Sequence, residues 1–150
     1  MANEETPAPE TGGLAATSFF SKTYDEASAL LLETRDYMAG ASILHWERPI
    51  VGLIHSRETT RITARVLHMM AWLMIQRAVH AGEIPPEAAA EERHRLAGRE
   101  VCLDAGAENA PAMPDRLRDL LARSRRLYQR IARLDEMIAR DRANGADRGG

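Results

Sequence analysis

The side chains best suited to chemistry in this chain of 150 residues are arginines at helical spacing. Arg61, Arg65, His68 and Trp72 fall on one face of a segment with helical periodicity, at about 100° per residue. A guanidinium group presents a planar set of donors that matches a carboxylate, so such a face could bind an acidic partner. We therefore expect Arg61, Arg65, His68 and Trp72 to form a recognition surface or a dimer surface.

A second set of arginines lies in the last third of the chain. Residues 114–142 carry nine arginines against five acidic residues, whereas residues 1–36 carry two basic residues against seven acidic ones. The two segments could pair with each other inside the fold, which would leave the arginines of residues 57–65 free to meet partners. Arg126 and Arg133 lie away from the apolar stripe of their segment, so we expect them to form a docking face for an acidic partner. A GC-rich genome would produce the same preference for arginine with no function attached.

Residues that could support catalysis are present but are not arranged for it. The chain contains no phosphate-binding loop, no G-x-G-x-x-G, no H-E-x-x-H and no nucleophile elbow. Glu33 and Asp36 are adjacent carboxylates that usually only solvate a helix, and nothing near Cys102 in the sequence lowers a thiol pKa. Five histidines are scattered without ligand spacing: His45, His55, His68, His80 and His94. We expect no catalytic, cofactor or metal site, and a protein that is not an enzyme.

Length and composition favour one globular domain of ordinary polarity. Hydrophobic residues make up 45% and charged residues 28% of the chain, and the formal net charge is −2. A single cysteine excludes an intramolecular disulfide. The longest apolar run, residues 69–75, is far shorter than the roughly 20 residues of a membrane helix, and the N-terminus is acidic, unlike a signal peptide. A cytoplasmic protein is the default expectation.

The first predicted helix follows a leader, residues 1–17, which we expect to be disordered because it has little to bury. Thr23 and Glu26 fit a capping box at the helix start, and Gly40 fits its end. Residues 41–56 are ambiguous, because Pro49 and Gly52 weaken a helix whereas Ser56 could cap the next one. The apolar stripe of this helix comprises Tyr24, Ala27, Leu31, Thr34 and Met38.

The second predicted helix has a buried stripe and an unusually apolar second half. Gly82 sits where a glycine commonly ends a helix. Residues 67–79 are apolar nearly all round, so either the next segment of the chain or a second chain must cover Trp72. Pro85 and Pro86 can start a short charged helix over residues 87–96, and residues 98–114 are predicted to form a loop. The stripe comprises Ile62, Val66, Met69, Met70 and Leu73.

The third predicted helix spans residues 115–141 and carries an apolar seam of the coiled-coil type. No segment shows the alternation of a strand. The predicted fold is all-α: an antiparallel three-helix bundle with a short accessory helix and disordered termini. The bundle would occupy residues 18–142, and residues 143–150 would form a short flexible tail. The seam comprises Leu117, Leu120, Ser124, Leu127, Ile131, Leu134 and Ile138, widened by Leu121 and Tyr128.

Three segments of the chain are distinctive: SKTYDEASALLLETRDYMA at 21–39, ETTRITARVLHMMAWLMIQRAVHAGEI at 58–84 and LLARSRRLYQRIARLDEMI at 120–138. Together they resemble the RcdA family of alphaproteobacteria, the regulators of CtrA degradation. The resemblance covers residues 18–140 or so, in the same order, and its middle segment is the most specific.

The resemblance implies a three-helix bundle that forms homodimers and acts as a non-enzymatic adaptor for the ClpXP protease. Such adaptors join a response-regulator-type partner that primes the protease, and they tether cargo such as the cell-cycle regulator CtrA. A tether raises the local concentration of cargo without new contacts at the protease active site. The resemblance also implies a cytoplasmic protein recruited to a cell pole. Family adaptors tend to have a long flexible C-terminal tail, whereas residues 143–150 are short and lack apolar anchors.

The alternative function is that of a small helical DNA-binding or transcription-regulating protein. Two helices joined at Gly82 suggest a helix-turn-helix, and the third helix is rich in arginine. However, the segment after the turn begins PPEAAAEE, whose charge is wrong for phosphates, and the whole chain is slightly acidic. A protein–protein interaction module is therefore the favoured class.

Overall fold

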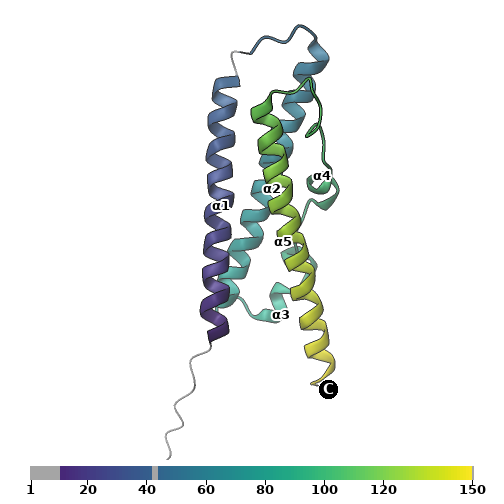
Figure 1. The fold of residues 1–150 in the computed structure, drawn as a ribbon. Coiled ribbons are helices and arrows are strands. Elements are labelled where there is room, and N and C mark those ends of the chain that lie inside the picture. The colour runs from purple at the N-terminus through teal and green to yellow at the C-terminus, as the bar shows by residue number, and fades with distance from the viewer. Residues whose placement is uncertain (1–10, 42–43, 150) are drawn as a thin grey trace, which may run out of the picture.

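Three long helices lying side by side form the protein (Figure 1). The structure, a computed structural model, describes residues 11–41 and 44–149. Within these ranges every regular element is helical and no residue is in a strand, which confirms the predicted all-α class. The elements are α1 (Thr11–Ala41), α2 (Pro49–His80), α3 (Pro86–Ala89), the 3₁₀ helix η1 (Glu92–His94), α4 (Arg99–Leu103) and α5 (Asp115–Asp147).

The first two helices run antiparallel. Phe20, in the first half of α1, packs edge-on against Trp72 in the second half of α2, with ring centroids 6.0 Å apart. At the opposite end, the Tyr37 hydroxyl lies 2.7 Å from His55 Nε2. A short connection between α1 and α2 therefore reverses the chain, as expected for neighbouring helices of a bundle.

The third long helix, α5, runs parallel to α2 rather than antiparallel to it. Arg65 of α2 donates to the Leu121 carbonyl, and Trp72, two turns further along α2, donates to Asp135 further along α5. The predicted antiparallel bundle is therefore wrong for this pair, as the course of the helices in Figure 1 also shows. The reason is the connection of residues 81–114, which returns along the roughly 48 Å length of α2 before α5 begins.

The helix ends differ from several predicted caps. The Thr23 hydroxyl donates to the Phe19 carbonyl (2.9 Å) inside α1, so the predicted capping box is wrong. α1 begins at Thr11, so residues 11–17 of the expected leader are helical, whereas residues 1–10 lie outside the described residues. Ser56 lies inside α2, which starts at Pro49, and α5 continues through residues 143–147 of the expected tail.

Gly82 ends α2 as predicted. Its φ of 76° lies in the left-handed region, which glycine adopts without a steric penalty. Its N–H donates to the Val79 carbonyl and the Glu83 N–H donates to the Ala78 carbonyl, which is the Schellman pattern. The segment beyond departs from prediction. The expected helix over residues 87–96 is split into α3 and η1, and the expected loop over residues 98–114 contains α4.

The core confirms most of the predicted apolar stripes. Ile62, Val66, Met69 and Leu73 of α2 are buried, and the α5 seam is buried as far as Ile131 with Leu134 and Ile138 packed against it. Met38 is an exception, because 44% of its surface is exposed. The large core side chains of α5 are Leu117, Leu120, Leu121, Leu127, Tyr128 and Ile131.

A buried histidine joins α1 to α2 near their connection. His55 is hydrogen-bonded to Tyr37, and the Trp46 ring packs 4.8 Å from it, centroid to centroid. Gly52 permits this packing, because a β-carbon there would lie 2.8 Å from the Trp46 ring. Burial lowers the pKa of His55, since desolvation disfavours the charged imidazolium.

We predict that the protein loses stability in weak acid through His55. The neutral form is favoured in the folded state, so the unfolded chain binds more protons once the pH falls below about 6.5. The free energy of unfolding should therefore fall as the pH is lowered from 7 through the folded pKa of His55. Urea denaturation at a series of pH values measures this slope.

The matched comparison is His55→Gln against His45→Gln, since His45 is exposed. The slope below neutral pH should flatten in the first variant and persist in the second. An identical slope in both variants would contradict the role of His55.

Candidate interaction surfaces

The predicted face of Arg61, Arg65, His68 and Trp72 is not an open surface. Arg65 and Trp72 are only 0% and 2% exposed, and the Arg61 side chain is 11% exposed. The prediction that these four residues form a recognition or dimer surface is therefore corrected for Arg65 and Trp72. Of the alternatives for covering Trp72, the same chain does so, because α5 and α1 pack over it.

The Arg65 guanidinium bridges three parts of the chain without a carboxylate partner. Its Nε donates to the Cys102 carbonyl (2.9 Å) and Nη2 to the Asp104 carbonyl (2.6 Å), which fixes the end of α4 on α2. Its Nη1 donates to the Leu121 carbonyl (2.9 Å) and to Ser124 Oγ (3.0 Å) of α5. Only the five-donor fork of arginine can reach acceptors in so many directions.

Burial lowers the pKa of Arg65 to about 10, and the nearby positive charge of Arg61 acts in the same direction. At neutral pH the group therefore still carries its charge. Backbone carbonyl dipoles, rather than an ion pair, stabilise this buried charge. Removing the guanidinium would leave buried acceptors without donors, which is the costly case for hydrogen bonds.

Trp72 takes part in a second buried polar cluster. Its Nε1 donates to Asp135 Oδ1 (2.8 Å), and the other carboxylate oxygen accepts from Arg95 Nε (2.9 Å) and Arg99 Nη2 (2.7 Å). Asp135 is only 4% exposed. The Tyr128 hydroxyl adds a bond to the Ala97 carbonyl (2.7 Å). These hydrogen bonds tie the connection of residues 81–114 to α2 and α5 at a second position along the bundle.

A third cluster surrounds Glu58, the acidic residue of α2. Glu58 accepts from Arg57 Nε and Arg61 Nε, each at 3.0 Å, and from the Ala107 N–H at 3.2 Å. Its burial opposes ionisation, but these donors outweigh that effect and lower the pKa of Glu58. Arg61 also donates to the Val101 carbonyl (2.7 Å). A β-carbon at Gly106, whose φ is 60°, would lie 2.1 Å from Glu58 Oε2.

His68 faces the same returning connection. A β-carbon at Gly98 would lie 2.6 Å from His68 Cδ2, so the imidazole rests against the residue that precedes α4. Arg61, Arg65, His68 and Trp72 therefore do share one face of α2, as predicted. That face of α2 packs against the connection of residues 81–114 of the same chain and not against a partner.

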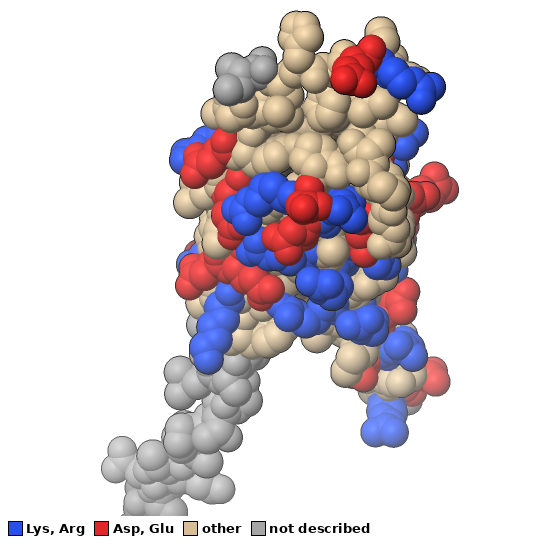
Figure 2. Space-filling model, turned by 45° about the horizontal axis from the view of Figure 1, so that its top comes forward, with Lys and Arg blue, Asp and Glu red and all other residues tan. Residues whose placement is uncertain are grey.

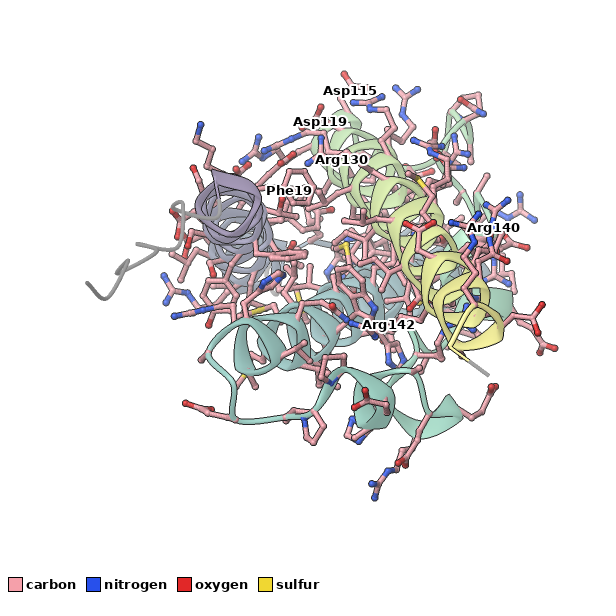
Figure 3. All side chains as sticks on the ribbon, turned by 90° about the horizontal axis from the view of Figure 1, so that it is seen from below. Phe19, Asp115, Asp119, Arg130, Arg140 and Arg142 are labelled. Carbon is pink, nitrogen blue, oxygen red and sulfur yellow. The ribbon has the colours of Figure 1, made fainter. Side chains whose placement is uncertain are left out.

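The expected pairing between the acidic first helix and the arginine-rich last helix is present. Arg123 binds Glu33 through two bonds of 2.7 and 2.8 Å, Arg116 binds the same carboxylate at 2.9 Å, and Arg130 pairs with Glu26. The hydrogen bond from Arg123 lowers the pKa of Glu33. Figure 3 shows Arg130 on the side of α5 that faces α1.

Arg126 and Arg133, the predicted docking residues of α5, are exposed. Among the described residues no carboxylate lies within 4.0 Å of either guanidinium. The neighbouring Arg125 binds Glu108 and is the main cause of its lowered pKa, to which the charge of Arg126 also contributes. Figure 2 shows basic and acidic side chains interspersed over the middle of the face that it presents. Arg126 and Arg133 therefore make no ion pair within the described residues.

The outward face of α2 carries an apolar stripe, of which only the part within residues 67–79 was predicted, as a segment apolar nearly all round. Leu53, Leu67 and Met74 are 67%, 57% and 59% exposed. Residues at intervals of seven build this stripe, and a second row of alanines runs beside it. The available signal was a second heptad pattern on α2, offset from the buried stripe. We call this surface the α2 stripe: Leu53, Thr60, Leu67 and Met74, with Ala64, Ala71 and Ala78.

Two shallow hollows flank the centre of the α2 stripe. One, of about 310 Å³, is lined by Thr60, Ala64 and Val101 and also by Ser56, Arg57 and Arg61. The other, of about 330 Å³, is lined by Met74, Ala78 and Ala81 and also by Arg77 and Glu83. Glu58 is the acidic residue of α2 and it is buried, so the stripe presents no carboxylate of α2.

In the described part of the chain, no group of three or more His, Cys, Asp or Glu side chains is placed to hold a metal ion. Across residues 11–41 and 44–149, none of the helices combines the length and apolar character needed to cross a bilayer.

Comparison with known proteins places this helical fold in a family. Residues 12–148 match a family model described as "Protein of unknown function (DUF1465)". The fold also matches the crystal structure of RcdA from Caulobacter crescentus CB15, with a TM-score of 0.60 and 34% sequence identity. That match covers 79% of this chain and 89% of the other. A search of curated proteins gives no match.

The protein is thus a helical-bundle protein of the class to which that crystal structure belongs. The chain is a member of the RcdA family.

We predict that Arg65→Met destabilises the fold by about 3–5 kcal/mol, the usual effect of removing one partner from a buried charged network. Arg65→Lys should recover only part of this loss, because one ammonium group cannot reach acceptors on both α4 and α5. Urea denaturation measures the free energy of unfolding of each variant.

Arg35→Met is the control, since Arg35 is an exposed residue whose ion pair with Asp36 is at the surface. It should change stability by less than about 1 kcal/mol. Equal effects at positions 35 and 65 would show that the buried network adds nothing.

Proposed function

We propose that this protein is a non-enzymatic adaptor that helps to deliver cell-cycle regulatory proteins to the ClpXP protease. Its partners are ClpX together with a response-regulator-type priming adaptor, and its cargo is a CtrA-like transcription regulator. It works in the cytoplasm, with recruitment to a cell pole. The observation that carries the proposal is the similarity to RcdA over nearly the whole helical domain.

The geometry suits a tether better than a catalyst. The buried side chains of Arg65, Asp135 and Glu58 are hydrogen-bonded to the connection of residues 81–114 and hold it in place. The groups left exposed are an apolar stripe on α2 and unpaired arginines on α5, which are binding features. A rigid body with two such surfaces can raise the local concentration of one partner near another.

We further propose a homodimer formed through the α2 stripe. A row of alanines lets two helices approach closely, while Leu67 and Met74 provide the large apolar side chains that bury area. A two-fold axis near Leu67 would bring Met74 of one copy opposite Thr60 of the other, where the hollow beside Ala64 lies. The absence of α2 carboxylates from this face favours contact with a second apolar surface.

The nucleic-acid alternative loses support in the described part of the structure. Arg116, Arg123 and Arg130 of α5 are paired with α1, so they are not available to phosphates. The helix after Gly82, which a helix-turn-helix would place in the major groove, is α3 and has only 4 residues.

We predict that Leu67→Glu converts a dimer into a monomer. A carboxylate at the centre of the α2 stripe would be buried without a partner, and its desolvation would oppose association. Sedimentation velocity measures the change, and circular dichroism should show unaltered helix content because position 67 is 57% exposed in the single chain.

Leu32→Glu is the matched control, since Leu32 is 51% exposed on α1 and lies outside the stripe. This variant should remain dimeric. A wild-type monomer would refute the dimer, and a dimeric Leu67→Glu variant would refute its location.

We predict that the protein accelerates degradation of a CtrA-like regulator by purified ClpXP when the priming response regulator is present. The expected reason is the higher local concentration of cargo, so the rate gain should be largest at low cargo concentration and should vanish near saturation. Gel-based degradation assays with and without this protein measure it. An unchanged rate at every cargo concentration, with a priming adaptor shown to be active, would refute the adaptor function.

A further inference from the structure

We propose that Arg126, Arg133 and Arg140 of α5 form a binding row for the acidic face of a helix in a partner protein. This inference rests on the proposed adaptor function and deepens it, because it gives the chemistry of one partner. The surface is defined by these three residues together with Met137, and we call it the arginine row.

Spacing is the first argument. The three arginines are seven residues apart on α5, so they line up along one side of the helix at intervals of about 10.5 Å. All three are exposed. A partner helix with carboxylates at the same interval could pair with each of them in one docking geometry, as the flanking charges of a coiled coil do.

Pairing within the chain is the second argument. The other arginines in the first half of α5 are already engaged. Arg116 and Arg123 bind Glu33, Arg130 pairs with Glu26, and Arg125 binds Glu108. In the described residues, by contrast, no member of the arginine row has a carboxylate within 4.0 Å; Arg140 Nε only approaches the Glu136 carbonyl, at 3.4 Å.

The position of the row is the third argument. Figure 3 shows Arg140 on the side of α5 turned away from α1, and within the described residues none of the ion pairs between these two helices involves a residue of the row. Met137, which is 54% exposed, adds an apolar contact beside the charges. Methionine at a binding surface adapts to different partners. An acidic amphipathic helix therefore fits better than a polyanion without apolar groups, such as nucleic acid.

The arginine row and the α2 stripe can each bind a partner at the same time. α2 and α5 pack against each other through their buried faces, so their outward faces point in different directions. A dimer through α2 would leave both copies of the row exposed. Two acidic helices, or two linked copies of one partner, could then bind a single dimer.

The test uses a fluorescent helical peptide with glutamate at positions i, i+7 and i+14 and leucine beside the second glutamate. Fluorescence anisotropy measures its binding to the full-length wild-type protein and to the triple variant Arg126→Gln, Arg133→Gln, Arg140→Gln. We expect binding to the triple variant to be about tenfold weaker, the sum of three exposed charge pairs. Wild-type binding should also weaken steeply as salt is raised from about 0.05 to 0.5 M.

The control variant Arg35→Gln, Arg93→Gln, Arg148→Gln removes the same charge from exposed positions elsewhere and should bind as tightly as wild type. A peptide of identical composition with its glutamates on different faces should bind more weakly. Equal binding by both triple variants, or by both peptides, would overturn the proposal. So would tighter binding of a double-stranded DNA oligonucleotide at the same ionic strength.

The assay contains no protease, so its result is separate from the degradation assay above. Binding that depends on the row, without faster degradation, would keep the arginine row and refute the adaptor. Faster degradation that persists in the triple variant, together with no binding of the peptide, would keep the adaptor function and refute the arginine row.

Discussion

A single buried guanidinium holds two of the long helices, α2 and α5, and the connection between them in one arrangement. Arg65 is wholly buried, and its donors end on carbonyls from α4, from Asp104 and from α5. Each of these carbonyls must lie at a set distance and direction for the buried charge to be tolerated. The arrangement of α4 between α2 and α5 follows from that requirement. The clusters around Glu58 and Asp135 then fix the connection on either side of it.

Periodicity in the sequence was enough to predict which residues form the core, but not which segments of the chain pack over Arg65 and Trp72. The stripes of Ile62–Leu73 and Leu117–Ile131 are buried as predicted, because apolar spacing depends only on the helix itself. Arg65 and Trp72 were assigned to a surface because charge and position on a helical wheel cannot show that a distant carbonyl or carboxylate lies within reach. The partners of Arg65 are 37 to 59 residues away in the chain.

The direction of α5 was also beyond sequence reasoning. A three-helix pattern with an accessory segment is compatible with either direction, and the parallel course depends on how residues 81–114 pack. By contrast, the pairing of α1 with α5 was predictable from charge, since one segment is acidic and the other rich in arginine. The same reasoning failed for α2. Arg61 and Arg65 serve the interior, whereas Leu53, Leu67 and Met74 on the outer face are exposed, so the face open to a second chain is not the predicted one.

The long return from Gly82 to Pro114 has a consequence for how much this fold can vary. The entropy of closing a flexible loop grows only slowly with length, by about 0.6 kcal/mol for each doubling. Residues inserted at the exposed positions 81–83, between α2 and α3, would therefore change stability little. Residues inserted between Gly98 and Asp104 would displace the carbonyls that Arg65 requires. The start of the connection can thus diversify between species, whereas the segment from Gly98 to Asp104 must keep its length as long as the buried arginine remains.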